Sequence, residues 1–283
     1  MKGSIQKVNK AFPVALTAFT PDIETIYFDG DLSCLERRCV AVVGSRRCTQ
    51  YGRTVARMIG RRMAENDVTL VSGLAKGIDT AAHLGALEAG GKTVAVLGGG
   101  TDTYYPPENK GLQQQIAREG LLLSERWPEY AVKPYDFPKR NRIIAALAES
   151  VAVVEAGNRS GALITAECAA EMGKRVYAVP GNITSLYSFG TNKLIRENVT
   201  PLILLDDLLI DMGVEPQGIC IKERLGKDEQ TVFNVIKSGG EITVDEIHHK
   251  TNMKPSEING IIAVLEMKGI IFSSMGKIFV AKF

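Results

Sequence analysis

The stretch Val40-Ala41-Val42-Val43-Gly44-Ser45-Arg46-Arg47 decides the fold of this chain. Its apolar first half predicts a short buried strand, and the glycine and polar residues after it predict a tight turn. A helix is expected from about Tyr51 to Glu65, where apolar residues recur on one helical face. A strand, a glycine turn and a helix in this order are typical of a phosphate-binding α/β unit.

The same pattern repeats along the chain. Further strands are expected at residues 68–71, 93–97, 121–123, 151–154 and 176–179, and further helices at 78–88, at 162–172 and in a segment that ends at 118. A short strand is also expected at 26–28. Strands that alternate with helices favour a mostly parallel sheet with helices on both faces. The sequence therefore predicts an α/β protein with an extended Rossmann-like sheet.

Glycine turns follow four of these strands, at Gly44, Gly73, Gly98 and Gly157. In a parallel sheet such turns lie along the carboxyl edge, which is the usual place for a ligand crevice. The arginines that we expect beside these turns favour a polyanion as the ligand: Arg46, Arg47, Arg140 and Arg142. The first turn lacks a Gly-x-Gly-x-x-Gly motif, so neither a dinucleotide nor any other cofactor is expected.

A basic stretch, Phe137-Pro138-Lys139-Arg140-Asn141-Arg142, leads into an apolar run that predicts a buried helix. Its cations then stand near a helix N-terminus, where free backbone N–H groups already favour an anion. Phe137 is expected to precede the helix and to offer its ring to a base, as in proteins that hold single-stranded nucleic acid. The alternative is that the arginines are structural, with Arg140 or Arg142 paired with Glu155.

Composition limits the other possibilities. The hydrophobic content of 45%, the charged content of 23% and the net charge of +2 describe an ordinary globular protein, in which a nucleic-acid site would be a local patch. Five cysteines without a Cys-x-x-Cys pair and three scattered histidines predict neither a disulfide framework nor a metal site, and reduced thiols in the cytoplasm are expected. No apolar run approaches the length that spans a bilayer.

The pattern changes near the C-terminus. We expect a linker at 213–226, three helices at 230–237, 243–250 and 255–268, and two strands at 270–272 and 277–280 around a turn at Met275-Gly276. Three helices followed by a hairpin predict a winged helix at 227–283. Seven lysines and seven acids in this segment cancel, which favours a protein-contact or regulatory role over DNA binding. The remaining domains are expected at 39–212, for the Rossmann-like domain, and at 1–38, for an N-terminal extension that packs on it.

Together the motifs resemble the DNA processing protein A (DprA/Smf) family. The resemblance covers roughly residues 12–205 and rests on Val43-Gly44-Ser45-Arg46, Ser72-Gly73-Leu74-Ala75-Lys76-Gly77-Ile78-Asp79 with Ala82-His83, Tyr105-Pro106 with Glu108-Asn109, Leu123-Ser124-Glu125, Phe137-Pro138 with Arg140-Asn141-Arg142, Glu155-Ala156 with Ser160-Gly161-Ala162, Ala178-Val179-Pro180-Gly181, and Gly190-Thr191-Asn192 with Leu194-Ile195. It implies a cytoplasmic protein that binds single-stranded DNA, forms a homodimer and loads the RecA recombinase in transformation or recombination, with no known catalytic reaction. Two features depart from the family: the first 38 residues are too short for its frequent N-terminal helical domain, and Asn198 stands where a glycine is common.

The resemblance also implies the site residues. The DNA pocket would be lined by Gly44, Ser45, Arg46, Arg47, Ser72, Gly73, Phe137, Arg140, Asn141 and Arg142, completed by Ser160 and Gly161, with Lys174 at its periphery. The dimer interface would include Leu194, Ile195, Leu202 and Leu204.

Two other functions compete with this one. The first is a nucleoside monophosphate hydrolase with Glu155 and Asp79 as its acid–base pair, which the absence of a Pro-Gly-Gly signature before the glutamate disfavours. In the binding protein, Asp79 and His83 lie one helical turn apart and are expected to hydrogen-bond each other. The second alternative is a transcriptional regulator that acts through the C-terminal module alone.

Overall fold

The computed structural model describes residues 1–216, 225–267, 270–274 and 276–280. The chain divides into two compact units, Met1–Pro216 and Gln217–Phe283. Residues 217–224 of the predicted linker, with Cys220, and Met275 of the predicted hairpin turn lie outside the described residues.

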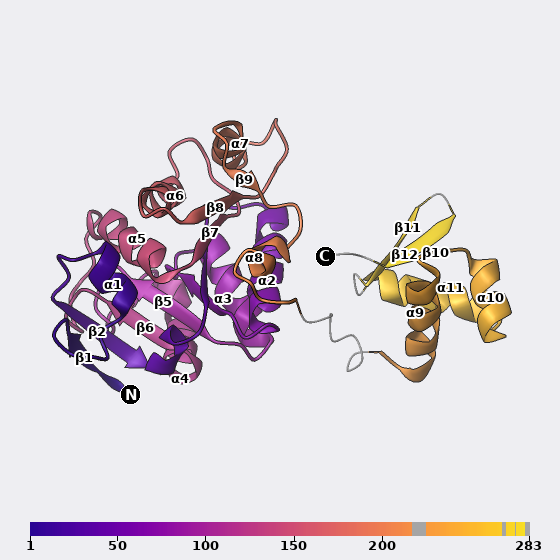
Figure 1. Ribbon diagram of the computed structural model, residues 1–283, viewed down its shortest axis with the longest axis horizontal. Coiled ribbons are helices and arrows are strands. Elements are labelled where there is room, and N and C mark those ends of the chain that lie inside the picture. Colours follow the sequence, from indigo (N-terminus) through magenta and orange to yellow (C-terminus); the bar gives the residue numbers. More distant parts are fainter. Residues whose placement is uncertain (217–224, 268–269, 275, 281–283) are drawn as a thin grey trace. The chain divides into compact units, whose positions relative to one another are not determined.

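The first unit is built on a nine-stranded sheet in the order β1-β2-β6-β5-β4-β3-β7-β8-β9 (Figure 1). The strands are β1 Lys2–Gln6, β2 Thr25–Gly30, β3 Cys39–Val43, β4 Thr69–Ser72, β5 Thr93–Leu97, β6 Leu121–Ser124, β7 Ser150–Val153, β8 Arg175–Ala178 and β9 Thr200–Pro201. All neighbours from β6 to β9 pair in parallel, and the edge strands β1 and β2 pair antiparallel. The prediction of a mostly parallel α/β sheet is confirmed.

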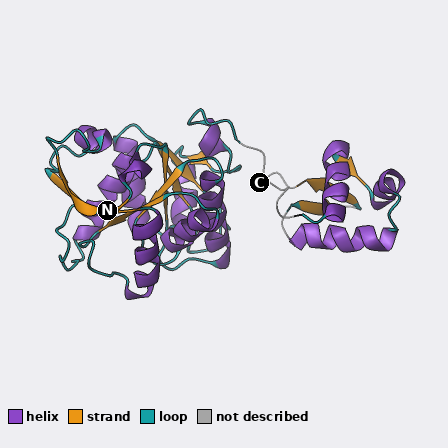
Figure 2. Cartoon of the chain, turned by 90° about the horizontal axis from the view of Figure 1, so that it is seen from below, coloured by secondary structure: helices purple, strands orange, loops and turns teal. Residues whose placement is uncertain are grey.

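Helices cover both faces of this sheet (Figure 2). Helices α1 (Val14–Phe19), α5 (Asp136–Leu147) and α6 (Gly161–Glu171) share one core, and α2 (Gln50–Ala64), α3 (Ile78–Glu88), α4 (Lys110–Glu119) and α8 (Asp207–Ile210) pack on the other face. Side chains of β3 alternate between the two: Ala41 and Val43 enter the first core, Val40 and Val42 the second. Because both faces are buried, the central strands are largely apolar on both faces and were predictable from the sequence.

Five α-helices and strands of this unit were not predicted from the sequence: β1, α1, α7 (Phe189–Arg196), β9 and α8. Strand β1 buries only one of its five residues, Ile5, so no alternation marks it. The segment from Ser188 to Leu205 contains helix α7, a turn and the two-residue strand β9. The first 38 residues thus extend the sheet by two strands. No helix among the described residues has the length and apolar character to cross a membrane.

The second unit has a core of its own. Helices α9 (Lys227–Gly239), α10 (Val244–Thr251) and α11 (Pro255–Met267) pack on a three-stranded antiparallel sheet of β10 (Glu241–Ile242), β12 (Lys277–Val280) and β11 (Ile271–Ser274). The three predicted helices are present, and β10 adds a strand to the predicted pair. Helix α11 contains two acids and no lysine or arginine, so it offers no cation to a phosphate. The winged-helix assignment stays a prediction.

Candidate nucleic-acid interface

The chain order of the strands places a crevice at one edge of the sheet. From β3 the chain builds outward through β4, β5 and β6 on one side, and then through β7, β8 and β9 on the other. The loops after β3 and β7 therefore diverge, and ligands of open α/β sheets bind at such a point. A groove of about 440 Å³ lies there. It brings together these predicted site residues: Gly44, Ser45, Arg46, Arg47, Phe137, Arg140, Asn141, Ser160 and Gly161.

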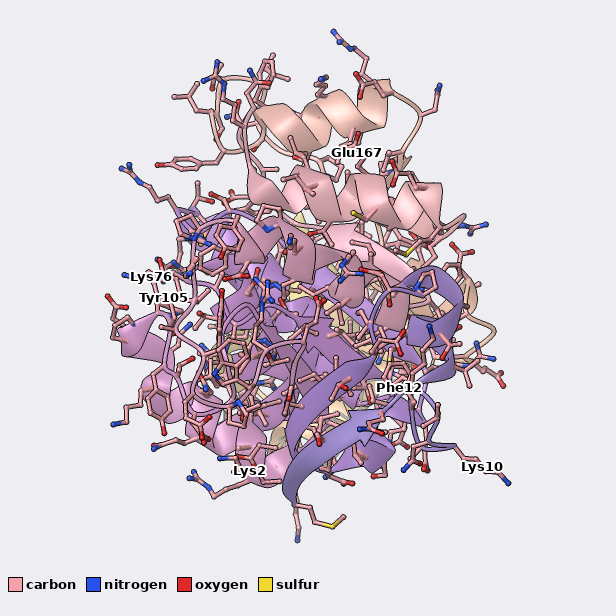
Figure 3. The ribbon with its side chains drawn as sticks, turned by 90° about the vertical axis from the view of Figure 1, so that its left-hand side faces the viewer. Lys2, Lys10, Phe12, Lys76, Tyr105 and Glu167 are labelled. Atoms are coloured by element: carbon pink, nitrogen blue, oxygen red, sulfur yellow. The ribbon has the colours of Figure 1, made fainter. Side chains whose placement is uncertain are left out.

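An arginine and an aromatic ring stack at this groove. The Cζ of Arg46 lies 4.6 Å from the centroid of the Phe137 ring, and the Tyr105 ring lies 5.2 Å from the same centroid. Tyr105 and Lys76 lie near each other at the rim of the unit (Figure 3) and line a smaller cavity of about 50 Å³ that Phe137 also borders. Phe137 lies inside the first turn of α5, so the prediction that it precedes the helix is wrong. Arg46 lines the groove together with Phe137.

Arg140 is a buried tie and not a surface cation. Its Nη1 donates to the carbonyl oxygen of Gly73 at 2.7 Å and to that of Val96, and its Nε donates to Oδ1 of Asn141 at 3.2 Å. A Cβ on Gly73 would lie 2.5 Å from Arg140 Nη2, so a side chain at this position would displace the guanidinium. The guanidinium thus joins α5 to the ends of β4 and β5, and only part of it reaches the groove.

A buried carboxylate compensates this charge. Asp79, in the first turn of α3, accepts hydrogen bonds from the backbone N–H of Gly73 at 3.1 Å and of Ala75 at 3.3 Å. Burial lowers the pKa of Arg140 to about 10, an effect that Asp79 opposes and Arg46 adds to. Burial likewise raises the pKa of Asp79, against the attraction of Arg140. The two charges hold the β4–α3 turn in place beneath the groove.

Two predicted site cations lie elsewhere, and both predictions need correction. Arg142 pairs with Asp22 at 2.6 Å and with Glu125 at 2.8 Å, on a different side of α5 from Arg140. Lys174 donates to the carbonyl oxygens at the C-terminal end of α5, those of Ala145, Ala146 and Ala148. Burial lowers the pKa of Lys174 to about 8. This lysine closes the end of α5 opposite to the groove.

Glu155 does not pair with either arginine, contrary to prediction. Its carboxylate accepts hydrogen bonds from the backbone N–H of Thr49 at 2.8 Å and from the Thr49 hydroxyl at 2.5 Å. Thr49 is the N-cap of α2, and the start of a helix favours an anion. Glu155 is therefore committed to the helix start and is buried.

The histidine near the site is also committed. His83 is fully buried, and its Nδ1 lies 2.7 Å from the Thr93 hydroxyl, so the predicted hydrogen bond to Asp79 is replaced by this one. Burial lowers the pKa of His83 to about 3, which keeps the ring neutral at physiological pH. Among the described residues no group of three or more His, Cys, Asp or Glu side chains converges to hold a metal ion.

Backbone groups and one further arginine complete the groove. Ser160 is the N-cap of α6, and its hydroxyl and carbonyl oxygens accept from the N–H groups of Ala162 and Leu163. The positive end of the α6 dipole therefore lies beside the groove, where the Nδ2 of Asn141 donates to the carbonyl oxygen of Gly161 at 3.1 Å. Ser72 lies below, buried, and donates to the carbonyl oxygen of Val42 at 2.6 Å. Arg159 is an exposed residue of the same groove that was not predicted, although a cation inside a glycine turn after a strand is a usable signal.

The charge of the groove is one-sided. Arg46, Arg47 and Arg159 are exposed, and of the described residues that line the groove the single acid is the buried Asp79. Exposed cations, the start of a helix and an aromatic ring without an exposed carboxylate form a surface for a polyanion.

The residues predicted for a dimer interface are divided. Leu202 is buried in the core between the sheet and α2, so it is corrected to a core residue. Leu194 is half-buried and packs on the other core, Ile195 is partly exposed, and Leu204 is 47% exposed. Ile203 and Ile210, which were not predicted, are more exposed than Leu204.

Comparison with known proteins gives one family. Residues 4–213 match the family model of DNA recombination-mediator protein A. The chain is 46% identical over 187 residues to the DNA processing protein DprA of Streptococcus pneumoniae, covering 66% of each chain. It is 40% identical over 240 residues to a putative DNA processing protein DprA of Mycobacterium tuberculosis, covering 82% of this chain and 62% of that one. The match thus spans less than two thirds of the length of these curated relatives.

Solved structures agree. The X-ray structure of DNA processing protein A from Streptococcus pneumoniae superposes with a TM-score of 0.71 at 42% identity, covering 74% of each chain. A structure of the Helicobacter pylori protein, which describes the single-stranded DNA binding mode of that protein, superposes with a TM-score of 0.66 at 28% identity, covering 75% of this chain and 95% of that one.

Proposed function

Because the chain belongs to the DNA recombination-mediator protein A family, we propose that its carboxyl-edge groove binds single-stranded DNA without regard to sequence. The observation that carries the proposal is the stack of Arg46 on Phe137 at the mouth of a groove without an exposed acid. The Helicobacter pylori relative, for which a single-stranded DNA binding mode is described, supports the same ligand.

Each part of the groove takes one part of the strand in this proposal. The exposed guanidinium groups of Arg46, Arg47 and Arg159 bind phosphates, and the positive end of the α6 dipole favours them. A base stacks with Phe137 and the guanidinium plane of Arg46, since both offer flat faces that accept any base. Arg140 contributes its buried charge and fixes the glycine turns, and it makes no more than a partial contact.

The proposal describes a binding protein and not an enzyme. Its support is that both carboxylates considered as an acid–base pair are occupied: Asp79 by backbone N–H groups and Glu155 by Thr49. Neither is free to take a proton from a ligand in the groove, so hydrolysis of nucleoside monophosphates is not favoured.

From the family resemblance we also propose that the protein forms a homodimer and acts with a recombinase. A homodimer would form through the edge at α7 and β9, where Ile195, Ile203 and Leu204 leave apolar surface exposed, and a two-fold contact would place each patch on its copy. The bound strand would then be delivered to the RecA recombinase. The second unit, in which the numbers of lysines and acidic residues are equal, would bind another protein.

The test compares single- and double-stranded oligonucleotides of mixed sequence by fluorescence anisotropy. Single strands should bind much more tightly, and Arg46→Ala and Phe137→Ala should each cost about 1–3 kcal/mol, or roughly 5- to 150-fold in Kd. Because the two side chains stack on each other, the double variant should lose less than the sum. The salt slope should flatten for Arg46→Ala and stay nearly constant for Phe137→Ala.

The matched control is Arg118→Ala, which removes an exposed arginine from the C-terminal end of α4. Equal affinity for single and double strands, or parent-like binding by both groove variants, would refute the proposed site.

A further inference from the structure

A second basic surface lies on helix α2, outside the groove described above. Arg53, Arg57 and Arg61 stand four residues apart, so they form one stripe along the helix. They line a groove of about 470 Å³ between α2 and α3, together with Gln50, Gly77 and Thr80. Helix α2 contains four arginines and no acid.

The stripe carries more charge than the fold uses. One acid faces it: Glu88 of α3 pairs with Arg57, from Nε at 2.7 Å, and lies 3.7 Å from Nη2 of Arg61. The fourth arginine of the helix, Arg62, is buried and forms a two-pronged pair with Asp206 at 2.6 and 3.1 Å. The inward arginine is thus paired through its Nε and Nη2, whereas among the described residues the three outward ones share the carboxylate of Glu88.

Arg53 has the least structural reason to be positive. It is exposed in the N-terminal part of α2, where the helix dipole disfavours a cation. Within the described part of the chain it forms no ion pair. It lies beside the Cys48 thiol, whose pKa is raised by burial and lowered in part by the charge of Arg53. Arg61, by contrast, stands in the last turn, where a cation stabilises the helix.

The two grooves meet at one ridge. Gly77 lines the α2–α3 groove, and a Cβ on it would lie 2.5 Å from the carbonyl oxygen of Ser45 and 2.8 Å from that of Arg46. Ser45 and Arg46 line the first groove, so a single backbone separates the two surfaces. Along α2 the arginines follow one another at intervals of about 6 Å, since each residue rises about 1.5 Å. Such a row can meet successive phosphates of an extended strand.

We propose that the α2–α3 groove binds the sugar–phosphate backbone of the same DNA strand, next to the nucleotides held in the first groove. This inference rests on the proposed function of that groove. The strand crosses the Gly77 ridge, and its phosphates pair with Arg53, Arg57 and Arg61 in turn. Glu88 opposes this binding, because it occupies two of the three guanidinium groups and repels phosphate.

The test uses two lengths of oligonucleotide, about 6 and about 20 nucleotides, because the shorter one fills only the first groove. The double variant Arg53→Gln/Arg57→Gln should bind the longer strand roughly 10-fold more weakly and the shorter one within about 2-fold of the parent. Its salt slope for the longer strand should fall by about 1.4, which is about 0.7 for each lost phosphate contact. Glu88→Gln should change the affinity in the opposite direction, with tighter binding of the longer strand only.

Arg118→Gln serves as the matched control, and circular dichroism with the fluorescence of Trp127, the single tryptophan, checks the fold. Arg53→Gln alone has no ion pair to lose, so it tests the inference even where the double variant is destabilised.

Parent-like binding of the longer strand by the double variant would overturn the inference, and so would an equal loss at both lengths. If Arg46→Ala leaves binding of the short strand unchanged, the proposed function of the first groove is refuted. The effect of Arg53→Gln on the long strand tests the α2–α3 groove independently of that result.

Discussion

Arg46 and Arg140 face the same groove, yet we expect their removal to have different effects. Arg140→Met leaves the carbonyl oxygens of Gly73 and Val96 without their charged donor and removes the cation whose attraction offsets the burial of Asp79. The loss of two hydrogen bonds from a charged donor to buried acceptors should cost about 3–6 kcal/mol of unfolding free energy. Arg46→Met removes an exposed side chain without an ion pair and should change stability by less than about 0.5 kcal/mol while weakening DNA binding.

Urea denaturation followed by Trp127 fluorescence measures the loss, because this tryptophan belongs to the first unit. Arg140→Lys keeps the charge but cannot reach both carbonyls, so it should cost about 1–3 kcal/mol and give a folded variant. In an Asp79→Asn background the carboxylate is gone, and Arg140→Met should cost about 1–3 kcal/mol less than in the parent.

An Arg140→Met variant within 0.5 kcal/mol of the parent would refute the assignment of this arginine as a buried tie. Costs that add in the double variant would show that Asp79 and Arg140 do not act as a pair.

Three further results are expected. Because burial lowers the pKa of His83 to about 3, the unfolded chain binds one more proton than the folded chain between pH 6.5 and 3. On acidification through this range the free energy of unfolding should fall by up to about 1.4 kcal/mol per pH unit. In pH-dependent urea titrations His83→Gln should remove this contribution to the slope, and the exposed control His249→Gln should not. Lys174→Met should cost about 2–3 kcal/mol by the same denaturation measurement, since the carbonyls at the end of α5 lose their donor, with an unchanged Kd for single-stranded DNA as the distinguishing result. Leu204→Glu should convert a dimer into a monomer by light scattering without loss of secondary structure; an unaltered dimer would place the interface elsewhere.

The sheet could be read from the sequence because its central strands are buried on both faces. An apolar run that ends in a glycine turn is a local signal, and the strands β3, β4, β5 and β7 all carry it. Strand β1 has no such signal, because its order comes from pairing with β2 at the sheet edge. Helix α7 is short and half-exposed, so its sequence carries no clear helical periodicity.

The position of the site at the carboxyl edge of the sheet was predictable, but the identity of the side chains that line it was less so. The glycine turns and Arg46 follow directly from strand ends, and topology alone brings them together. Arg140 and Arg142 belong to a helix, on which residues two apart point about 200° from each other, since each residue turns by about 100°. Which of them faces the sheet depends on how the apolar residues of α5 dock, and this rotation is a tertiary property.

The buried charge of Arg140 also affects how the groove would bind an anion. A cation that is 6% exposed cannot follow a ligand, and burial lowers the pKa of Arg140 to about 10 against the attraction of Asp79. Arg46, 4.6 Å from the Phe137 ring, adds a like charge nearby and lowers the pKa of Arg140 further. Two guanidinium groups at one groove therefore repel each other in the free protein. A phosphate of the proposed strand would relieve this repulsion, so part of its binding free energy is stored in the unliganded fold. An arrangement of this kind favours binding of an anion at the cost of some stability, which is the exchange expected at a functional site.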